Sequence, residues 1–225
     1  MTRKIIHVVD DDASFRSATG HLLEVFDYEV VLFDSAESFL RNTSNARPDC
    51  LLLAVRAAGI DGLALQAEIQ CRLEGLPIVF VSSQPDTRAA VAAIKAGAED
   101  FLVKPVSGDE LVAAVRRALA RSEAIRLAAE SNASKLNRYQ RLTRREREVL
   151  TALVRGLRNK QIAAELGTTE RTIKAHRSRV MHKLEVQSVA ELVILTESIR
   201  KLPSFGNTLP VRQYNHAPSA SLHPY

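Results

Sequence analysis

The sequence predicts an α/β doubly wound five-stranded parallel sheet followed by a small all-α domain of four helices. Short apolar runs alternate with amphipathic helical segments through residues 1–120, whereas residues 141–202 carry only helical periodicity. Charge divides the chain in the same way: residues 1–120 hold 12 Lys/Arg and 17 Asp/Glu, a net of −5, and the remainder hold 19 and 9, a net of +10. We therefore expect domains at 1–120 and 141–202, a linker helix at 121–140 and a disordered tail at 203–225.

Five apolar runs supply the strands of the first domain. The third run, from Cys50 to Val55, is continuously apolar, as expected for a central parallel strand covered by helices on both faces. Asp34 with Glu37, and Ser107 with Glu110, have the spacing of a capping box at a helix start. The predicted strands are 5–9, 29–33, 50–55, 77–81 and 101–103, and the predicted helices between them include 14–26, 63–72 and 87–96.

Polar residues lie where three of these strands end, and an alanine lies at a fourth. In a doubly wound sheet, ligands bind at the carboxyl ends of the strands. The residues at those ends are Asp10 and Asp11 (first strand), Ala54 (third), Ser82 (fourth) and Lys104 (fifth).

Composition narrows the class of protein. Cys50 and Cys71 are the only cysteines, which allows no disulfide framework or zinc site of usual spacing, and both lie in apolar segments where we expect inert, buried thiols. No apolar stretch reaches the roughly 18 residues of a membrane span. The first apolar run stops at three aspartates, too soon for a secretory signal. We expect a cytoplasmic protein.

The second domain has the pattern of a helix-turn-helix. Thr143 and Glu146 form a capping box at the start of the first helix, and Gly156 ends it. A short helix at 159–166, a turn at Gly167 and a longer basic helix at 169–184 follow, with a last helix at 188–199. In the longer helix, the predicted buried stripe is Ile173, Val180, Met181 and Leu184. Its opposite side, which includes Lys183, is basic and suits the major groove of DNA, although a solvated basic helix in an unrelated bundle would share these features.

Four segments of this domain closely resemble the LuxR-type DNA-binding domain over about residues 142–200. They are LTRREREVL at 142–150, GLRNKQIA at 156–163, TIKAHR at 172–177 and KL at 183–184. The resemblance implies binding to double-stranded DNA as a homodimer. It also implies that Lys174, Ala175 and Ser178 face base edges. Phosphate contacts and the rest of the basic face would come from Lys160, Arg171, Thr172, His176, Arg177 and Arg179.

The first domain resembles response-regulator receivers, which have a flavodoxin-like fold, over about residues 4–120. The matching segments include VVDDD at 8–12, KAGA at 95–98 and FLVKP at 101–105. In that family a histidine kinase passes a phosphoryl group to an aspartate. The resemblance assigns metal-holding acids to Asp10 and Asp11, the hydroxyl to Ser82, the lysine to Lys104 and the switch aromatic to Phe101.

The phosphoacceptor position of the resemblance is occupied by Ala54. A methyl group cannot take a phosphoryl group, and its presence removes a carboxylate that Mg²⁺ would need, so we expect no cofactor and at most weakened Mg²⁺ binding at Asp10 and Asp11. Lys104 is then expected to pair with Asp10 or Asp11. The loop at 56–59 also departs from the family, with Ala57 and Ala58 in place of the usual Met-Pro, which favours a natural degenerate receiver over an engineered variant.

The main interpretation is a DNA-binding transcription regulator that is not an enzyme and acts independently of phosphorylation. The first alternative is an ordinary phosphorelay response regulator seen as an acceptor-null variant, with a histidine kinase as partner only if the native chain has Asp at 54. An enzyme with a phosphohydrolase-like site is disfavoured by the missing nucleophile, and an adaptor without DNA binding by the intact basic helix. For the homodimer, the last helix offers an apolar face made of Leu192, Val193, Leu195, Thr196 and Ile199.

Overall fold

The computed structural model describes residues 3–42, 47–57 and 60–202, and its contacts divide the chain into two units after Ala128. Helix α5 (Gly108–Gln140) contains the whole of the predicted linker segment 121–140. Its residues up to Ala128 belong to the first unit and the later ones to the second. The tail predicted at 203–225 lies outside the described residues.

The first unit is built on a five-stranded parallel sheet with the strand order β2-β1-β3-β6-β7, which confirms the predicted fold class. Every residue of the central strands β3 and β6 is buried, as their continuously apolar sequences predicted. The strands are β1 (Ile5–Val9), β2 (Glu29–Phe33), β3 (Cys50–Ala54), β6 (Ile78–Ser82) and β7 (Asp100–Val103).

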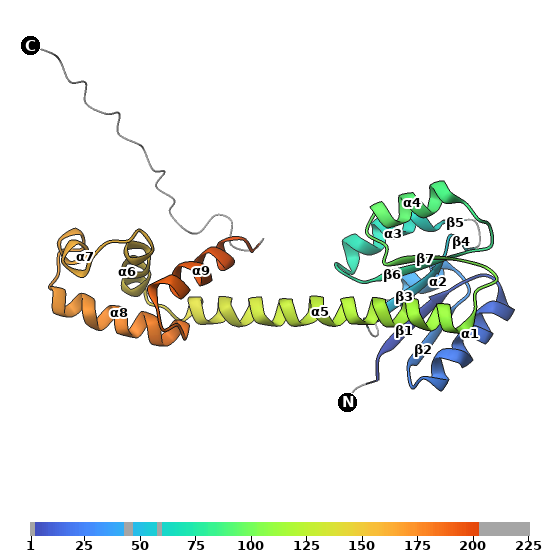
Figure 1. The fold of residues 1–225 in the computed structure, drawn as a ribbon, viewed down its shortest axis with the longest axis horizontal. Coiled ribbons are helices and arrows are strands. Elements are labelled where there is room, and N and C mark those ends of the chain that lie inside the picture. The colour runs from blue at the N-terminus through green and yellow to red at the C-terminus, as the bar shows by residue number, and fades with distance from the viewer. Residues whose placement is uncertain (1–2, 43–46, 58–59, 203–225) are drawn as a thin grey trace, which may run out of the picture. The chain divides into compact units, whose positions relative to one another are not determined.

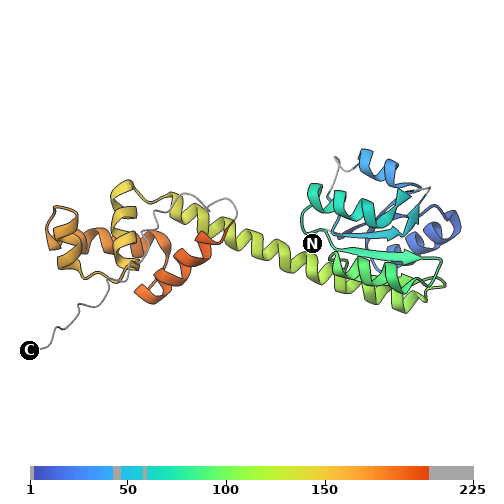
Figure 2. The same cartoon turned by 90° about the horizontal axis from the view of Figure 1, so that it is seen from above.

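Helices cover both faces of this sheet (Figures 1 and 2). Alternate residues of β3 serve the two faces: Leu51 and Leu53 pack in one core with residues of α2, α3 and α4, while Leu52 packs in the other with residues of α1 and α5. The helices of this unit besides α5 are α1 (Ala13–Val25), α2 (Ala36–Asn42), α3 (Gly62–Arg72) and α4 (Thr87–Lys95).

Three local predictions for this unit are wrong. Two short antiparallel strands, β4 (Arg56–Ala57) and β5 (Ile60–Asp61), precede α3, where the sequence indicated only a loop. Helix α2 is capped by the hydroxyl of Ser35, which accepts from the backbone N–H of Ser38, and not by a box of Asp34 with Glu37. Cys71 is exposed, because it lies on the outer side of α3; only Cys50 is buried.

The second unit is a helical domain around a single apolar core, consistent with the predicted helix-turn-helix fold. The capping box is confirmed: the Thr143 hydroxyl accepts from the Glu146 N–H at 3.3 Å, and the Glu146 carboxylate accepts from the Thr143 N–H at 2.8 Å. Besides the end of α5, the helices are α6 (Arg144–Val154), α7 (Asn159–Glu165), α8 (Glu170–Leu184) and α9 (Val189–Arg200).

The dimer face predicted on α9 is largely wrong. Leu192, Thr196 and Ile199 are buried within the domain core, and Leu195 packs against it. An amphipathic helix in a four-helix domain packs its apolar stripe against the core of that domain. The large apolar side chain that α9 leaves exposed is Ile194, with 69% of its surface accessible.

None of the helices in the described part of the chain combines the length and apolar character required to cross a membrane.

Candidate functional site

The carboxyl ends of four strands bring the predicted pocket residues together. Ala54 at the end of β3 pairs in register with Val81 of β6, and Ser82 at the end of β6 pairs with Val103 of β7. The backbone N–H of Lys104 donates to the carbonyl of Ser82 at 2.7 Å, so the chain leaves β7 directly beside β6. Asp10 follows β1 and donates its backbone N–H to the carbonyl of Phe33 in β2.

A close ion pair between Asp10 and Lys104 dominates this pocket. The Lys104 Nζ lies 2.8 Å from Oδ2 of Asp10, whose side chain is only 2% exposed. The two atoms form an ion pair although they are not aligned as a hydrogen bond. The other carboxylate oxygen of Asp10 accepts from the backbone N–H of Asp12 at 2.9 Å. A buried carboxylate must be paired to remain charged, and Lys104 supplies that charge. Of the two partners expected for Lys104, the structure has Asp10.

Two residues that the sequence analysis missed hold the Lys104 ammonium from other sides. It lies 3.9 Å from the centroid of the Phe15 ring, within range of a cation–π contact, and 3.8 Å from the carboxylate of Asp12. Asp12 also caps α1 by accepting from the N–H groups of Phe15 and Ser14. The N–H of Phe15 and the charge of Lys104 lower the pKa of Asp12. An aspartate just before an amphipathic run is an N-cap signal, so the role of Asp12 was visible in the sequence.

Of the remaining receiver positions, Ser82 and Ala54 are buried and make local contacts, whereas Asp11 is exposed. The buried Ser82 hydroxyl donates to the carbonyl of Gln84 at 2.8 Å and accepts from its N–H at 3.2 Å. Ala54 is 5% exposed, and its methyl group belongs to the core against α2, α3 and α4. Asp11 is exposed. A Cβ at Gly62 would lie 2.8 Å from the Ala54 carbonyl oxygen, so the start of α3 packs tightly on this strand end.

The predicted switch residue Phe101 is half-buried on β7. Its ring centroid lies 6.4 Å from that of Phe80 in the core. On its other side it lines a shallow apolar pocket beside α4, together with Ala90, Val91 and Ile94. Phe101 therefore connects the core to the surface of α4.

The donors of this pocket do not fit a divalent metal ion. Within the described ranges, no group of three His, Cys, Asp or Glu side chains is placed to hold one. Ala54 supplies no oxygen ligand, and Oδ2 of Asp10 faces an ammonium. A hard cation such as Mg²⁺ requires several oxygen ligands.

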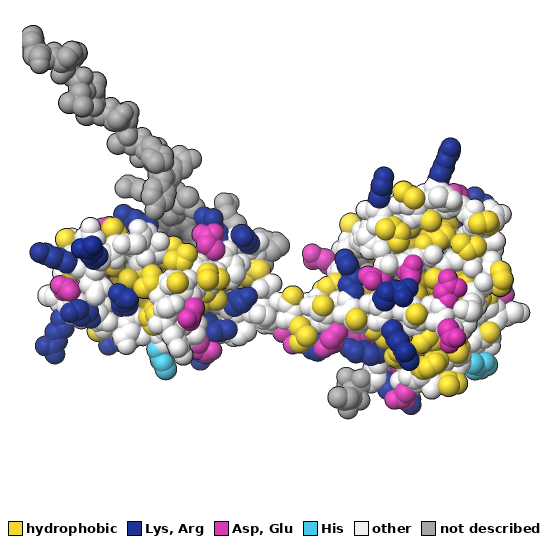
Figure 3. All heavy atoms as spheres, viewed as in Figure 1, with side chains coloured by type: hydrophobic (Ala, Val, Ile, Leu, Met, Phe, Trp, Pro, Cys, Tyr) yellow, Lys and Arg dark blue, Asp and Glu magenta, His cyan; other side chains and the backbone are white. Residues whose placement is uncertain are grey.

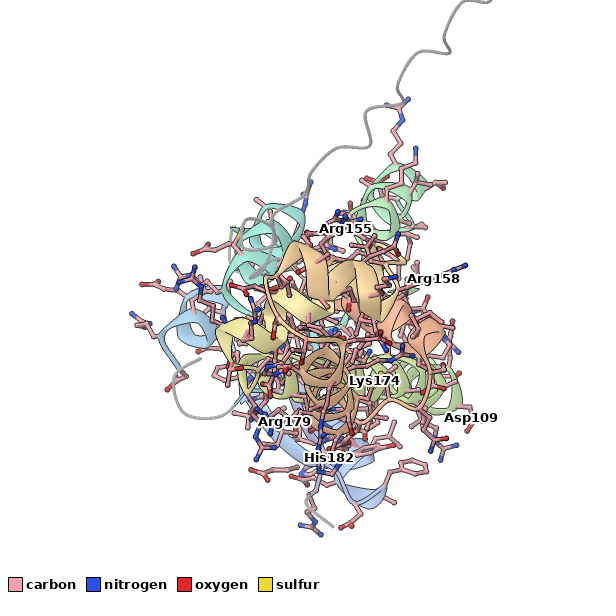
Figure 4. All side chains as sticks on the ribbon, turned by 90° about the vertical axis from the view of Figure 1, so that its left-hand side faces the viewer. Asp109, Arg155, Arg158, Lys174, Arg179 and His182 are labelled. Atoms are coloured by element: carbon pink, nitrogen blue, oxygen red, sulfur yellow. The ribbon has the colours of Figure 1, made fainter. Side chains whose placement is uncertain are left out.

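The second candidate site is the outer face of α8 in the helix-turn-helix. Arg171, Lys174, Ala175 and Ser178 are all exposed, and their spacing places them on one side of the helix. Figure 3 shows Lys and Arg side chains projecting from this domain around α7 and α8, and Figure 4 shows Lys174 and Arg179 on α8. Glu170 lies 3.6 Å from the Lys174 ammonium. Lys160 is exposed at the start of α7.

The other predicted contact residues flank this face. Arg179 is exposed, whereas Thr172, His176 and Arg177 are half-buried. The Thr172 hydroxyl lies 2.8 Å from the hydroxyl of Thr169, which caps the helix by accepting from the Thr172 N–H. Nδ1 of His176 is buried without a hydrogen-bond partner. These four positions lie beside the exposed side of α8 formed by Arg171, Lys174, Ala175 and Ser178.

The inner side of α8 is anchored by apolar and ionic contacts. Ile173, Val180 and Leu184 are buried as predicted, while Met181 is half-buried. Lys183, expected on the solvent side, instead donates to the carboxylate of Glu146 at 2.7 Å.

The ion pair of Lys183 with Glu146 joins α8 to the start of α6. Glu146 is 3% exposed. Burial raises the pKa of its carboxyl, but hydrogen bonds from Lys183 and Thr143 lower that pKa by more, so the net shift is downward. Lys183 also donates to the carbonyl of Arg141 at 3.2 Å. Arg138 of α5 pairs with Glu185, the left-handed residue that ends α8. The basic face is thus presented by a helix whose C-terminal end is tied by ion pairs to α5 and α6.

A five-stranded parallel sheet with an Asp–Lys pocket at its carboxyl edge, followed by a helix-turn-helix domain, defines a two-domain response regulator. The family model "Response regulator receiver domain" matches residues 6–116, and that of "Bacterial regulatory proteins, luxR family" matches residues 140–196. The chain belongs to the family of DNA-binding response regulators that join a receiver domain to a LuxR-type domain.

Full-length relatives support this assignment. The response regulator protein TodT of Pseudomonas putida is 37% identical over 196 residues, covering 87% of this chain and 86% of TodT. The transcriptional regulatory protein FixJ of Bradyrhizobium diazoefficiens is 37% identical over 197 residues, covering 86% and 95%. The structure of the response regulator StyR has a TM-score of 0.76 at 39% identity, covering 88% of this chain and all of StyR. Full-length FixJ from B. japonicum has a TM-score of 0.55 at 36% identity, covering 90% and 100%.

Proposed function

We propose that this response regulator binds double-stranded DNA as a homodimer and does so independently of phosphorylation of its receiver domain. The observation that carries the proposal is the methyl group of Ala54 at the end of β3, where the resemblance to receivers places the phosphoacceptor. The Asp10–Lys104 ion pair supports it, because the lysine that would face a phosphoryl group already has a carboxylate at 2.8 Å.

The DNA contacts divide into two groups. Lys174, Ala175 and Ser178 face base edges in the major groove, which their shared exposure on α8 supports. Two of these three side chains are short, so direct base readout is sparse. The second group holds the protein on phosphates and carries little sequence information. Its members are Lys160, Arg171, Thr172, His176, Arg177 and Arg179.

The receiver pocket has no group for a phosphodonor to modify at position 54. A ligand shifts a conformational equilibrium only through its different affinities for the two states, and a phosphoryl group without an attachment point has none. The dimerisation and DNA affinity of this protein are therefore set by its fixed contacts.

Small phosphodonors and a beryllofluoride mimic test this directly. The probe is a labelled duplex that this protein selects from a random-sequence pool, and the measurements are fluorescence anisotropy and sedimentation velocity. We expect the same dissociation constant and sedimentation coefficient with and without acetyl phosphate or beryllofluoride. Dimerisation that depends on the donor would contradict the proposal and point to another acceptor.

A second candidate function is an ordinary phosphorelay regulator seen as an acceptor-null variant. The presence of Asp10, Ser82 and Lys104 around Ala54 favours it. The variant Ala54→Asp separates the two. A silenced phosphorelay protein, with a histidine kinase as its partner, should regain donor-dependent dimerisation, whereas we expect the variant to stay unresponsive because Lys104 is held by Asp10. Ala54→Asn is the matched control, since it adds similar volume without the carboxylate.

A further inference from the structure

We propose that the ammonium of Lys104 takes the place of a divalent cation in the receiver pocket, so that the buried carboxylate of Asp10 is neutralised by the protein itself and the pocket does not require or bind Mg²⁺. The inference deepens the proposed function and rests on it in one respect, the treatment of Ala54 as the native residue. It assigns Lys104 a role as an internal counter-ion for Asp10.

Asp10 needs a positive partner to remain charged. Its carboxylate is almost fully buried, and burying an unpaired charge is costly. One oxygen accepts from the N–H of Asp12, and the other lies 2.8 Å from the Lys104 ammonium. Both oxygens therefore already face positive or donor groups, and a metal ion would have to displace Lys104 from Oδ2.

Lys104 is held in the pocket by contacts on several sides. Its side chain is 14% exposed, with the Phe15 ring 3.9 Å from Nζ and the Asp12 carboxylate at 3.8 Å. Its backbone N–H donates to the Ser82 carbonyl. The ammonium thus has an acidic, aromatic and largely buried environment suited to a permanent cation.

A metal ion in this pocket would need oxygen ligands besides Asp10. Ala54 contributes a methyl group, and the Ser82 hydroxyl donates to the Gln84 carbonyl. No cluster of three His, Cys, Asp or Glu side chains in the described ranges is arranged to bind a metal ion. A single ammonium matches the buried carboxylate of Asp10, whereas Mg²⁺ would find few oxygen ligands in this pocket and would repel Lys104.

The test uses Mn²⁺ as the probe, because the electron paramagnetic resonance signal of the free ion disappears on binding. The full chain is compared with Asp10→Asn, Lys104→Met, the double variant, and Lys95→Met, which removes an exposed lysine of α4 as the matched control. We expect the wild type and Lys95→Met to bind no more Mn²⁺ than Asp10→Asn does. Lys104→Met should bind Mn²⁺ at least about tenfold more tightly than the wild type, because its buried carboxylate has lost its counter-ion, and the double variant should lose that gain.

Calorimetric unfolding of the full chain adds a readout of stability. We expect the receiver transition of Lys104→Met to lie roughly 5–15 °C below that of the wild type in EDTA and to rise with Mg²⁺. The wild type and Lys104→Arg, which keeps the positive charge, should not respond to Mg²⁺. If Lys104→Met does not fold, the comparison of wild type with Asp10→Asn still decides the question.

Asp10-dependent binding of Mn²⁺ by the wild type would overturn the inference. It would also be overturned if Lys104→Met folds and gains no Asp10-dependent Mn²⁺ binding, since Lys104 would then not be what excludes the metal. An error in the proposed function would show itself in a different experiment. It would appear as an effect of a phosphodonor on DNA binding by the unsubstituted chain, which is measured without these variants.

Discussion

A buried histidine makes the stability of the receiver domain sensitive to mild acid. His7 lies on β1, three residues before Asp10, and is 3% exposed. Its ring centroid lies 5.1 Å from that of Phe33 and 5.9 Å from that of Phe39. Its Nδ1 atom is buried without a hydrogen-bond partner, and burial lowers its pKa from 6.5 to about 4. Protonation would place a charge in an aromatic core.

The size of the effect follows from the two pKa values. The unfolded chain binds a proton near pH 6.5 and the folded domain only near pH 4, so the stability that neutral His7 allows is present above about pH 6.5 and declines as the pH falls toward 4. Each pKa unit corresponds to about 1.4 kcal/mol, which gives a total of about 3 kcal/mol, of which about 2 kcal/mol is lost by about pH 5.

Urea unfolding of the full chain measures this loss, with the receiver transition followed separately from that of the helical domain. The control is His7→Leu, which fills similar volume and cannot be protonated. We expect the free energy of unfolding of the wild-type receiver to fall by about 2 kcal/mol between about pH 7.5 and 5, and that of His7→Leu to fall by much less. Equal pH dependence in the two proteins would refute this account of His7 and assign the slope to carboxylates.

Three further predictions concern DNA binding and its support. Affinity for duplex DNA should fall about 10³–10⁵-fold between about 50 and 200 mM salt if roughly 6–10 phosphates are contacted per dimer. Lys160→Ala should make affinity less dependent on salt, whereas the control Lys95→Ala should not. Binding that does not depend on salt would contradict the assignment of the basic face of α8 to DNA. Glu146→Ala should destabilise the helical domain by about 2–4 kcal/mol in denaturant unfolding, because it removes a cap and the partner of Lys183, whereas Glu148→Ala, which loses surface ion pairs, should cost about 1 kcal/mol or less. Ile194→Glu on the exposed side of α9 should weaken dimerisation, and footprints should show half-sites about one helical turn apart; a single half-site at saturation would argue against a dimer.

The sheet could be predicted because its signals are local. The apolar runs of β3 and β6 are uninterrupted, and parallel strands buried on both faces require that pattern. The helix-turn-helix was equally accessible, because Thr143 caps its helix as predicted, and Thr169 and Ser188 cap the two helices that were predicted to begin at these residues. The pair β4–β5 was missed because two-residue strands have no periodicity to detect.

The surface of α9 shows where periodicity stops being informative. A stripe containing Leu192, Thr196 and Ile199 indicates that one side of the helix is buried, but not whether its own domain or a second copy buries it. The domain core takes that stripe, and Ile194, on another side, is left exposed. The helical projection was also insufficient for Lys183. It placed this side chain in solvent, whereas the structure pairs it with Glu146 of α6.

Topology placed the pocket residues correctly but could not supply their contacts. Asp10, Ala54, Ser82 and Lys104 lie at the carboxyl ends of β1, β3, β6 and β7, which are adjacent in that order, so their convergence follows from the strand order alone. Phe15 contacts Lys104 with its ring from the start of α1, and Gln84 contacts Ser82 with its backbone from the loop after β6; both contacts depend on how these segments pack and not on the strand order. Their roles were therefore absent from any pattern of spacing.

The charge balance of the pocket explains why Ala54 is compatible with a stable receiver fold. A carboxylate at position 54 would add a second acid to the buried end of the sheet, where Lys104 can neutralise only one, and that excess is what a divalent ion relieves. With a methyl group there, Asp10 and Lys104 form a one-to-one pair, and Ala54 packs in the apolar core. We therefore expect neither a phosphoryl group nor a metal ion to change the population of receiver states. Under the proposed function, occupancy of DNA by a homodimer must follow protein concentration by mass action, and control passes from modification of the receiver to the amount of protein present.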